Sequence, residues 1–277
     1  MNASVIPTCP LPRVTSEFLR DALTSPGVGI LTECLDPALT ANAYWLARDV
    51  FRLPPDVRER YRAPGPAMGG YTPSGIEGVA GYGPDFHREF WDVREPYRFP
   101  NRFPAEVPGF ADAISVLYLL LRGNVVDRLL PFLGAVCGQP RAYFVDRTRG
   151  AHHLFRMSHY PALPIDVLQG RERFPTHRDF GLLTIFIGGA EPGLEFSRDG
   201  QWIPLTLSPG TVAVGAGLIL RMESGKRVCA YRHRVAPIPH ERTSLTFFLE
   251  PDPRVLLPNG EYAGEYLARL VQKIRSN

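Results

Sequence analysis

Short segments in which apolar and polar residues alternate fill the second half of the chain. Eight such segments follow one another without an intervening helical pattern, at residues 154–160, 182–187, 194–197, 201–204, 211–214, 218–221, 227–233 and 244–249. Asp199-Gly200, between two of them, is a dipeptide typical of a tight hairpin turn. Short strands with regular turns predict an antiparallel sandwich or barrel, and a jelly roll is the natural candidate.

The first half of the chain is predicted to be mostly helical, with one early strand at residues 27–31. Apolar residues recur at helical spacing in the segments 16–23, 37–51, 55–61, 107–136 with an interruption near Gly123, and, near the end of the chain, 261–274. We therefore expect a mainly β fold with flanking helices, in a single domain over residues 1–277. A mostly helical part (1–150) and a C-terminal helix (257–277) would wrap a jelly-roll core (151–256).

The composition is ordinary for a globular protein, with 277 residues of which 44% are hydrophobic and 21% charged. The net charge is +3, and the positive charges are almost all Arg. No dense basic run indicates nucleic-acid binding, although a mildly basic balance tolerates an anionic ligand. No apolar run reaches the length of a membrane span, and the N-terminus lacks a secretion-signal pattern. The four cysteines share no CxxC spacing and suit a reducing compartment. We expect a cytoplasmic protein without a nucleic-acid or membrane partner.

Residues 63–84 are rich in Gly and Pro and show little periodicity, which predicts a long loop. No Gly-Lys-Ser/Thr sequence closes it, so it is not a phosphate-binding loop. Long loops in compact domains are usually functional or disordered. One hypothesis is that this loop covers a pocket and selects the substrate through nearby side chains, namely Tyr71, Tyr82, Phe86 and His87. A plain surface loop is an equally good interpretation.

Two imidazoles and one carboxylate form the main candidate site. His177 and Asp179 are two positions apart and therefore share one face of a strand, while His233 follows fifty-six positions after His177. This ligand set leaves one face of a metal open and serves non-haem Fe(II) and oxygen chemistry. A His-x-Asp triplet alone is a weak signal, so the second His and the residues that follow it carry the hypothesis.

A candidate carboxylate receptor begins nine positions after the second His. Arg242 and Ser244 share a strand face, and a guanidinium with a hydroxyl offers charge-assisted, bidentate hydrogen bonds. On the expected strand at the start of the core, Tyr160 shares a polar face with Arg156 and Ser158, which indicates a pocket interior. The alternatives are that Arg242 makes a surface ion pair at a strand edge and that the polar face meets solvent.

These motifs together resemble the isopenicillin N synthase-like branch of the Fe(II)/2-oxoglutarate-dependent dioxygenases. The likeness covers most of the chain and keeps its order through residues 70–71, 85–90, 157–161, 177–179, 193–196, 199–203, 233–235, 242–244 and 247–249. The resemblance implies a double-stranded β-helix, which is a jelly-roll variant, wrapped by N-terminal helices. It also implies that His177, Asp179 and His233 hold iron.

By the same resemblance, Arg242 and Ser244 would bind the distal carboxylate of 2-oxoglutarate, with help from Tyr160. Two departures from the family stand out. Ser158 replaces the usual Asn, so one hydrogen bond to the cosubstrate or to a strand is expected to differ. Residues 214–217 lack the Asn and Asp usually found there. Neither departure touches a predicted metal ligand.

The resemblance implies an enzyme that uses Fe(II), 2-oxoglutarate and O2 to oxidise a small molecule, for example in specialised-metabolite biosynthesis, with release of succinate and CO2. Hydroxylation is the default outcome, and desaturation, cyclisation and epoxidation stay open. One alternative is an iron oxidase or cyclase that does not use 2-oxoglutarate, in which Arg242 and Ser244 bind a substrate carboxylate. Another is a non-catalytic β-helix protein that binds a ligand.

Overall fold

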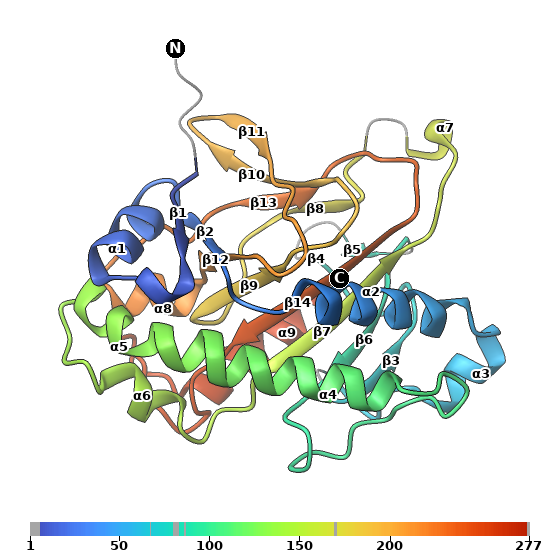
Figure 1. The fold of residues 1–277 in the computed structure, drawn as a ribbon, viewed down its shortest axis with the longest axis horizontal. Coiled ribbons are helices and arrows are strands. Elements are labelled where there is room, and N and C mark those ends of the chain that lie inside the picture. The colour runs from blue at the N-terminus through green and yellow to red at the C-terminus, as the bar shows by residue number, and fades with distance from the viewer. Residues whose placement is uncertain (1–5, 67, 80–82, 86, 169–170, 276–277) are drawn as a thin grey trace.

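Two β-sheets face each other across a cavity, and helices cover the outer side of the larger sheet (Figure 1). The computed structural model describes residues 6–66, 68–79, 83–85, 87–168 and 171–275. The larger sheet has the order β1 (Thr8–Pro10), β2 (Val28–Thr32), β12 (Val212–Ala216), β9 (Leu183–Ile187), β14 (Arg242–Leu249), β7 (Leu154–Tyr160), β6 (Glu89–Val93), β3 (Gly70–Thr72). The smaller sheet has the order β11 (Gln201–Pro204), β10 (Leu194–Arg198), β13 (His233–Val235), β8 (Phe174–His177), and β4 (Gly78–Val79) pairs with β5 (Gly83–Pro84). This is the jelly-roll architecture that the alternating segments predict.

The helices lie mainly in the first half of the chain, as predicted. They are α1 (Ser16–Thr24), α2 (Pro37–Arg52), α3 (Pro55–Arg60), α4 (Phe110–Leu120), α5 (Asp127–Val136), α6 (Tyr143–Thr148), α7 (Ile165–Leu168), α8 (Leu218–Glu223) and α9 (Ala263–Arg275), with a 3-10 turn at Leu11–Arg13. Helix α2 begins after Asp36, whose carboxylate accepts a hydrogen bond from the N–H of Ala38. The interruption expected near Gly123 is a π-helical segment, Leu121–Val126, between α4 and α5.

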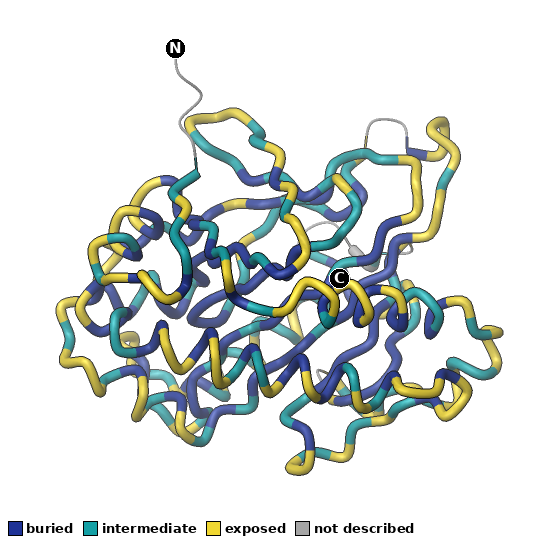
Figure 2. Tube along the Cα trace, in the orientation of Figure 1, coloured by how far each residue is buried: buried dark blue, intermediate teal, exposed yellow. Residues whose placement is uncertain are grey.

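The alternation along the strands divides the larger sheet into an apolar outer face and a cavity face. Phe155 and Met157 of β7 and Leu245 and Phe247 of β14 are buried in the core beneath the helices. Figure 2 shows these strands as a buried layer behind helices whose outer surfaces are exposed. The intervening residues of β7 and β14 point the other way and line the cavity. The polar face predicted on β7 is therefore a cavity wall.

One predicted strand is wrong, and a second is wrong in part. Residues 218–221 belong to the helix α8, in which Ile219, Leu220 and Glu223 are buried. A short apolar run is compatible with the period of a strand and with that of a helix, so its sequence alone does not distinguish the two. In the folded protein the run packs as a short helix. In the segment 227–233, only His233 belongs to a strand of the smaller sheet. The predicted hairpin turn is confirmed, because Arg198 pairs with Gln201 across it.

The Gly/Pro-rich segment 63–84 is not entirely a loop. It contributes β3 to the edge of the larger sheet, where Tyr71 lies opposite Trp91 of β6. Strand β6, which the sequence did not predict, joins β3 to β7. No helix in the described parts of the chain is long and apolar enough to cross a membrane.

Candidate metal centre and cavity

The three predicted metal ligands converge at the cavity end of the smaller sheet. His177 ends β8 and lies directly opposite His233 of β13, with 4.1 Å between the ring centroids. Asp179 follows β8 by two residues, and its two carboxylate oxygens each lie 3.5 Å from the Nε2 atom of one imidazole. The ligand atoms of all three lie within 4.8 Å of one another, so that they could hold one metal ion.

Two hydrogen bonds orient these side chains. The Nδ1–H of His177 donates to the carbonyl oxygen of Pro175 at 2.8 Å, which leaves the Nε2 lone pair directed at the centre of the cluster. The hydroxyl of Thr184, on β9 of the opposite sheet, donates to Oδ2 of Asp179 at 2.6 Å. Such contacts fix ligand orientation in metal sites. The donor set therefore fits a divalent transition metal such as Fe(II).

The electrostatics of the cluster favour the protonation states that a metal requires. Burial, together with the neighbouring His177, lowers the pKa of His233 to about 3. Burial alone would raise the pKa of Asp179, but its contacts with His233 and His177 hold it well below its ordinary value. At neutral pH His233 is therefore neutral and Asp179 ionised, which are the ligating forms.

An aromatic shell surrounds the imidazoles. The ring of Tyr231 stacks on His233 at 5.0 Å, and Phe186 meets His233 edge-on at 5.5 Å. Gly215 on β12 makes room for this stack, because a Cβ atom at that position would overlap the Tyr231 ring. The family's usual side chains in the segment 214–217 are thus replaced here by a glycine against which an aromatic ring packs.

The predicted carboxylate receptor lies on the cavity face of β14 and β7. Arg242 pairs with Tyr160 and Ser244 with Ser158 across the two strands, and all four line the cavity. The Nε–H of Arg242 donates to the carbonyl oxygen of Glu191 at 3.2 Å. Its guanidinium is thereby fixed with its Nη groups left for other acceptors, and no carboxylate among the described residues forms an ion pair with it.

Tyr160 is deeply buried beside two guanidinium groups. Burial raises the pKa of its hydroxyl, while the charges of Arg88 and Arg242 oppose the rise. The hydroxyl therefore keeps its proton at neutral pH and can donate it to a ligand.

The cavity has a volume of about 960 Å³ and extends from the metal ligands to the C-terminal helix. Its walls are mostly apolar, with Phe174, Phe180 and Phe248 among the larger contributors. Helix α9 contributes Leu267 and Val271, residues that sequence reasoning did not assign to the site. A mostly apolar cavity with a few convergent polar groups is typical of a small-molecule site.

An ion-pair network contributes three residues, Glu77, Arg156 and Arg275, to the cavity wall. Arg156 makes a bidentate pair with Asp92, with both contacts at 2.8 Å, and also reaches Glu77 at 3.1 Å. Glu77 accepts a second guanidinium, that of Arg275 on α9, at 2.9 Å. Burial alone would raise the pKa of Glu77, yet the charges of Arg156 and Arg88 hold it below its ordinary value. The network ties the Gly/Pro-rich segment to β7 and to the C-terminal helix.

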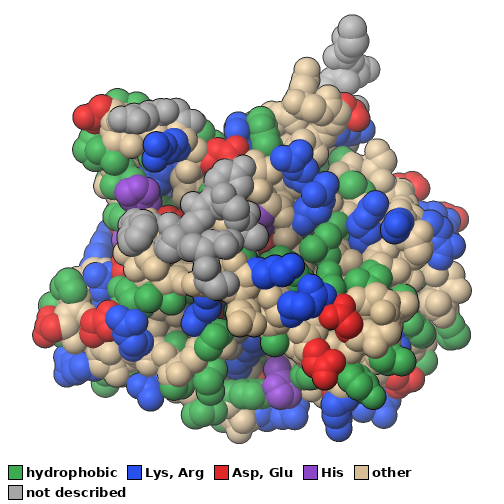
Figure 3. All heavy atoms as spheres, turned by 180° about the vertical axis from the view of Figure 1, so that it is seen from behind, with side chains coloured by type: hydrophobic (Ala, Val, Ile, Leu, Met, Phe, Trp, Pro, Cys, Tyr) green, Lys and Arg blue, Asp and Glu red, His purple; other side chains and the backbone are tan. Residues whose placement is uncertain are grey.

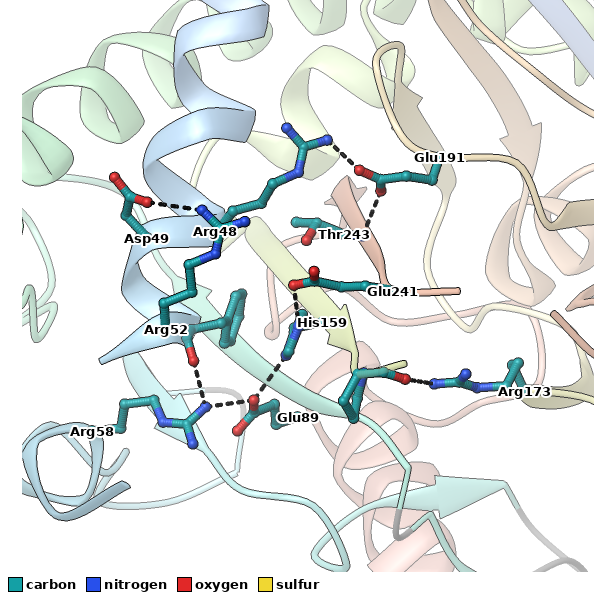
Figure 4. Close-up of polar contacts among 12 residues, drawn as sticks. Arg48, Asp49, Arg52, Arg58, Glu89, His159, Arg173, Glu191, Glu241 and Thr243 are labelled. Carbon is teal, nitrogen blue, oxygen red and sulfur yellow. Dashed lines mark hydrogen bonds and ion pairs between the residues drawn. The ribbon is translucent and has the colours of Figure 1, made fainter. Parts of the chain in front are cut away.

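Two of the residues expected to select the substrate, Tyr71 and His87, do not line the cavity. Tyr71 is buried on the outer face of the larger sheet, where its hydroxyl donates to Glu89. Figure 4 shows that Glu89 also contacts His159 and Arg58 on this face, on the opposite side of β7 from the cavity.

His87, a second residue of that hypothesis, is exposed and does not line the cavity. Tyr82 and Phe86 lie outside the described residues. The segment 63–84 does line the cavity, but through Pro66, Glu77, Gly78 and Val79.

Comparison with known proteins agrees with this geometry. A family model described as the 2OG-Fe(II) oxygenase superfamily matches residues 151–251. The chain is 27% identical over 238 residues to the 2-oxoglutarate-dependent dioxygenase gloF of Glarea lozoyensis, covering 75% of this chain and 72% of that protein. It is 26% identical over 255 residues to the 2-oxoglutarate-dependent dioxygenase htyE of Aspergillus rugulosus, covering 80% and 77%. A full-length Neurospora crassa protein, solved in complex with alpha-KG and thymine, has a similar fold, with a TM-score of 0.82 over 98% of both chains at 20% identity.

Proposed function

This chain belongs to the 2OG-Fe(II) oxygenase superfamily, and from that premise we propose which of its residues carry the activity. The protein is an Fe(II)- and 2-oxoglutarate-dependent dioxygenase. His177, Asp179 and His233 hold the iron. Arg242 and Ser244 bind the distal carboxylate of 2-oxoglutarate. The convergence of the three ligands on a cavity that also contains Arg242 supports this assignment best.

When bound, Fe(II) and 2-oxoglutarate supply the means to activate dioxygen and oxidise the substrate, with release of succinate and CO2. The chain's own residues provide the geometry. Thr184 holds the Asp179 carboxylate in place, and Tyr160 donates its hydroxyl proton to the same carboxylate as Arg242. The aromatic side chains that line the cavity exclude water from the reacting atoms.

We propose a small molecule with a largely apolar body as the substrate. The cavity volume of about 960 Å³ and its apolar walls support this class, and the similar N. crassa protein was solved with thymine, a small molecule. Hydroxylation is the default reaction, and desaturation, cyclisation or epoxidation would need the same residues. In Figure 3, Lys and Arg side chains are scattered over the back face among acidic and hydrophobic ones, which favours a small substrate over a nucleic acid. The four free cysteines support a cytoplasmic location.

The test is an anaerobic titration of the metal-free protein, first with Fe(II) and then with 2-oxoglutarate. A visible charge-transfer band that requires both additions is expected for wild type and for His87→Ala, which removes an exposed histidine outside the cavity. His177→Ala should abolish the band. Iron binding without a band would indicate an oxidase or cyclase independent of 2-oxoglutarate. Absence of iron binding would indicate a ligand-binding protein.

A further inference from the structure

Two arginines flank Tyr160 on the cavity face of the larger sheet. Arg242 of β14 lies opposite Tyr160 on one side. On the other side, β6 runs antiparallel to β7 with Glu89 opposite His159, so the preceding residue, Arg88, lies next to Tyr160. Both arginines line the cavity together with Tyr160. A row of guanidinium, phenol and guanidinium thus crosses three adjacent chain segments.

Arg88 is held rigidly within the protein. Only 7% of the residue is exposed, and its guanidinium lies over the rings of Phe174 at 3.9 Å and Phe90 at 5.3 Å. Its Nε atom is 3.4 Å from Oδ2 of Asp85, and neither atom has a hydrogen-bond partner among the described residues. Arg88 is therefore a buried, imperfectly paired cation that faces a cavity. Burying such a charge costs free energy unless a ligand or a neighbouring group interacts with it.

Two other buried arginines near the cavity, Arg156 and Arg173, donate their hydrogen bonds to acceptors within the protein. Arg156 uses three of its nitrogen atoms on Asp92 and Glu77. Arg173 donates to two backbone carbonyl oxygens. Arg88, by contrast, lies beside Tyr160 in the register of β6 and β7, and its positive charge opposes the rise in the pKa of the Tyr160 hydroxyl. Because an arginine only donates, the Tyr160 oxygen is the group that can accept from Arg88, and the hydroxyl's own proton remains available for a ligand acceptor.

We infer that Arg88 is a positioning residue of the cosubstrate site, which orients the Tyr160 hydroxyl toward the distal carboxylate of 2-oxoglutarate and supplies a second positive charge beside Arg242. The inference rests on the proposed function, in which Arg242, Ser244 and Tyr160 receive that carboxylate. The inference extends the proposed function by adding Arg88, a residue that precedes β6, to the cosubstrate site. It also makes the direction of the Tyr160 hydroxyl depend on Arg88.

The experiment compares two ligands that differ only in the distal carboxylate, 2-oxoglutarate and 2-oxopentanoate. Each is titrated anaerobically into the Fe(II)-loaded protein, and dissociation constants are taken from the charge-transfer band and from calorimetry. The variants are Arg88→Gln, Arg88→Lys and Tyr160→Phe, with Arg88→Gln also made in the Tyr160→Phe background. Arg269→Gln is the control, because it removes one positive charge from the C-terminal helix at a residue that does not line the cavity.

Arg88→Gln should weaken 2-oxoglutarate binding about tenfold, the loss expected for one charge-assisted hydrogen bond. The same variant should leave the affinity for 2-oxopentanoate unchanged, which also shows that it is folded. Arg88→Lys should recover part of the loss. In the Tyr160→Phe background, Arg88→Gln should add much less than in wild type, because the two residues act together. Arg269→Gln should bind both ligands as wild type does.

Equal 2-oxoglutarate affinity in Arg88→Gln and wild type would overturn the inference. An equal loss of affinity for 2-oxoglutarate and 2-oxopentanoate would also overturn it. Such a loss would mean that Arg88 has a structural role and does not act on the distal carboxylate. If wild type itself binds iron but shows no band with 2-oxoglutarate, the proposed function fails, and this inference fails with it. The wild-type titration therefore separates the two failures.

Discussion

The hydroxyl of Thr184 donates a hydrogen bond to Oδ2 of Asp179 at 2.6 Å. Thr184 belongs to β9 of the larger sheet, whereas Asp179 follows β8 of the smaller one. The bond therefore links the two sheets at the carboxylate that faces both His177 and His233. It also restricts the rotation of that carboxylate, which is what a metal ligand of fixed geometry requires.

Thr184→Val should weaken Fe(II) binding about tenfold, because the loss of a hydrogen bond to a ligating carboxylate typically costs this much or more. The valine keeps the shape and burial of the side chain. Thr184→Ser keeps the hydroxyl and should bind Fe(II) nearly as wild type does. Anaerobic metal titration measures both, and equal affinities for Thr184→Val and wild type would contradict the role assigned to the hydroxyl.

Gly215→Ala should lower the free energy of unfolding by about 2 kcal/mol, as overpacking of a filled core commonly does. The new Cβ atom would overlap the Tyr231 ring, which must then shift from its stack on His233. Fe(II) affinity should fall as well. Gly123→Ala is the control, since nothing lies within 4 Å of its added Cβ atom. Urea unfolding that shows the same stability for the two variants would refute the packing argument.

Arg242→Ala should weaken 2-oxoglutarate binding by more than about tenfold, because charge-assisted hydrogen bonds contribute roughly 1.5–3 kcal/mol each. Fe(II) binding should not change, because Arg242 is not among the clustered metal ligands. Arg242→Lys keeps the charge but loses the planar fork, so an intermediate affinity is expected. Calorimetry on the Fe(II)-loaded protein distinguishes these results. Similar affinities for all three proteins would exclude Arg242 from the carboxylate receptor.

Glu77→Gln should destabilise the protein by about 3 kcal/mol, because removing one member of a buried ion pair leaves uncompensated charge. Glu77 lies between Arg156 and Arg275, and its side chain is only 2% exposed. Arg275→Gln should cost less, since the arginine side chain is 24% exposed and its interaction is partly screened by solvent. Denaturant unfolding of both variants tests this order, and a larger loss for Arg275→Gln would contradict it.

The metal-free protein should lose stability as the pH falls from about 6.5 toward 3, in part because of His153. Burial, with the charges of Arg122 and Arg94, lowers the pKa of this histidine from 6.5 to about 3. Between these values the unfolded chain binds a proton that the folded protein excludes, so each such group reduces stability by about 1.4 kcal/mol per pH unit.

His153→Gln should therefore make the pH dependence shallower below pH 6.5, whatever its effect on stability at pH 7. Urea unfolding at several pH values between 7 and 4 provides the slopes. His233, whose pKa is also lowered to about 3, remains in this variant and should maintain part of the dependence. Identical slopes for the variant and wild type would show that His153 is not excluded from protonation in the folded state.

Local sequence patterns predict much of the site. The two-residue spacing of His177 and Asp179 puts both on one side of a strand end, and the same spacing in Arg242 and Ser244 puts both on the cavity face. These relations depend only on the period of an extended chain. For the same reason the alternating segments predict a jelly roll, and the period of 3.6 predicts helices such as α2.

Other features depend on contacts between distant segments, which no local period contains. The apolar run at 218–221 is helical because its buried side chains pack against distant segments, whereas its pattern alone fits either a strand or a helix. Arg88 lies beside Tyr160 only because β6 pairs with β7 in one particular register. Tyr71 faces away from the cavity because the pairing of β3 with β6 places it opposite Trp91 on the outer face. The sequence by itself determined the fold class, which follows from backbone periodicity, and the candidate ligands, which follow from residue types, their spacing and the resemblance to a family. Only the tertiary structure decided which side chains surround them, because strand pairing and packing set those neighbours across long separations in the chain.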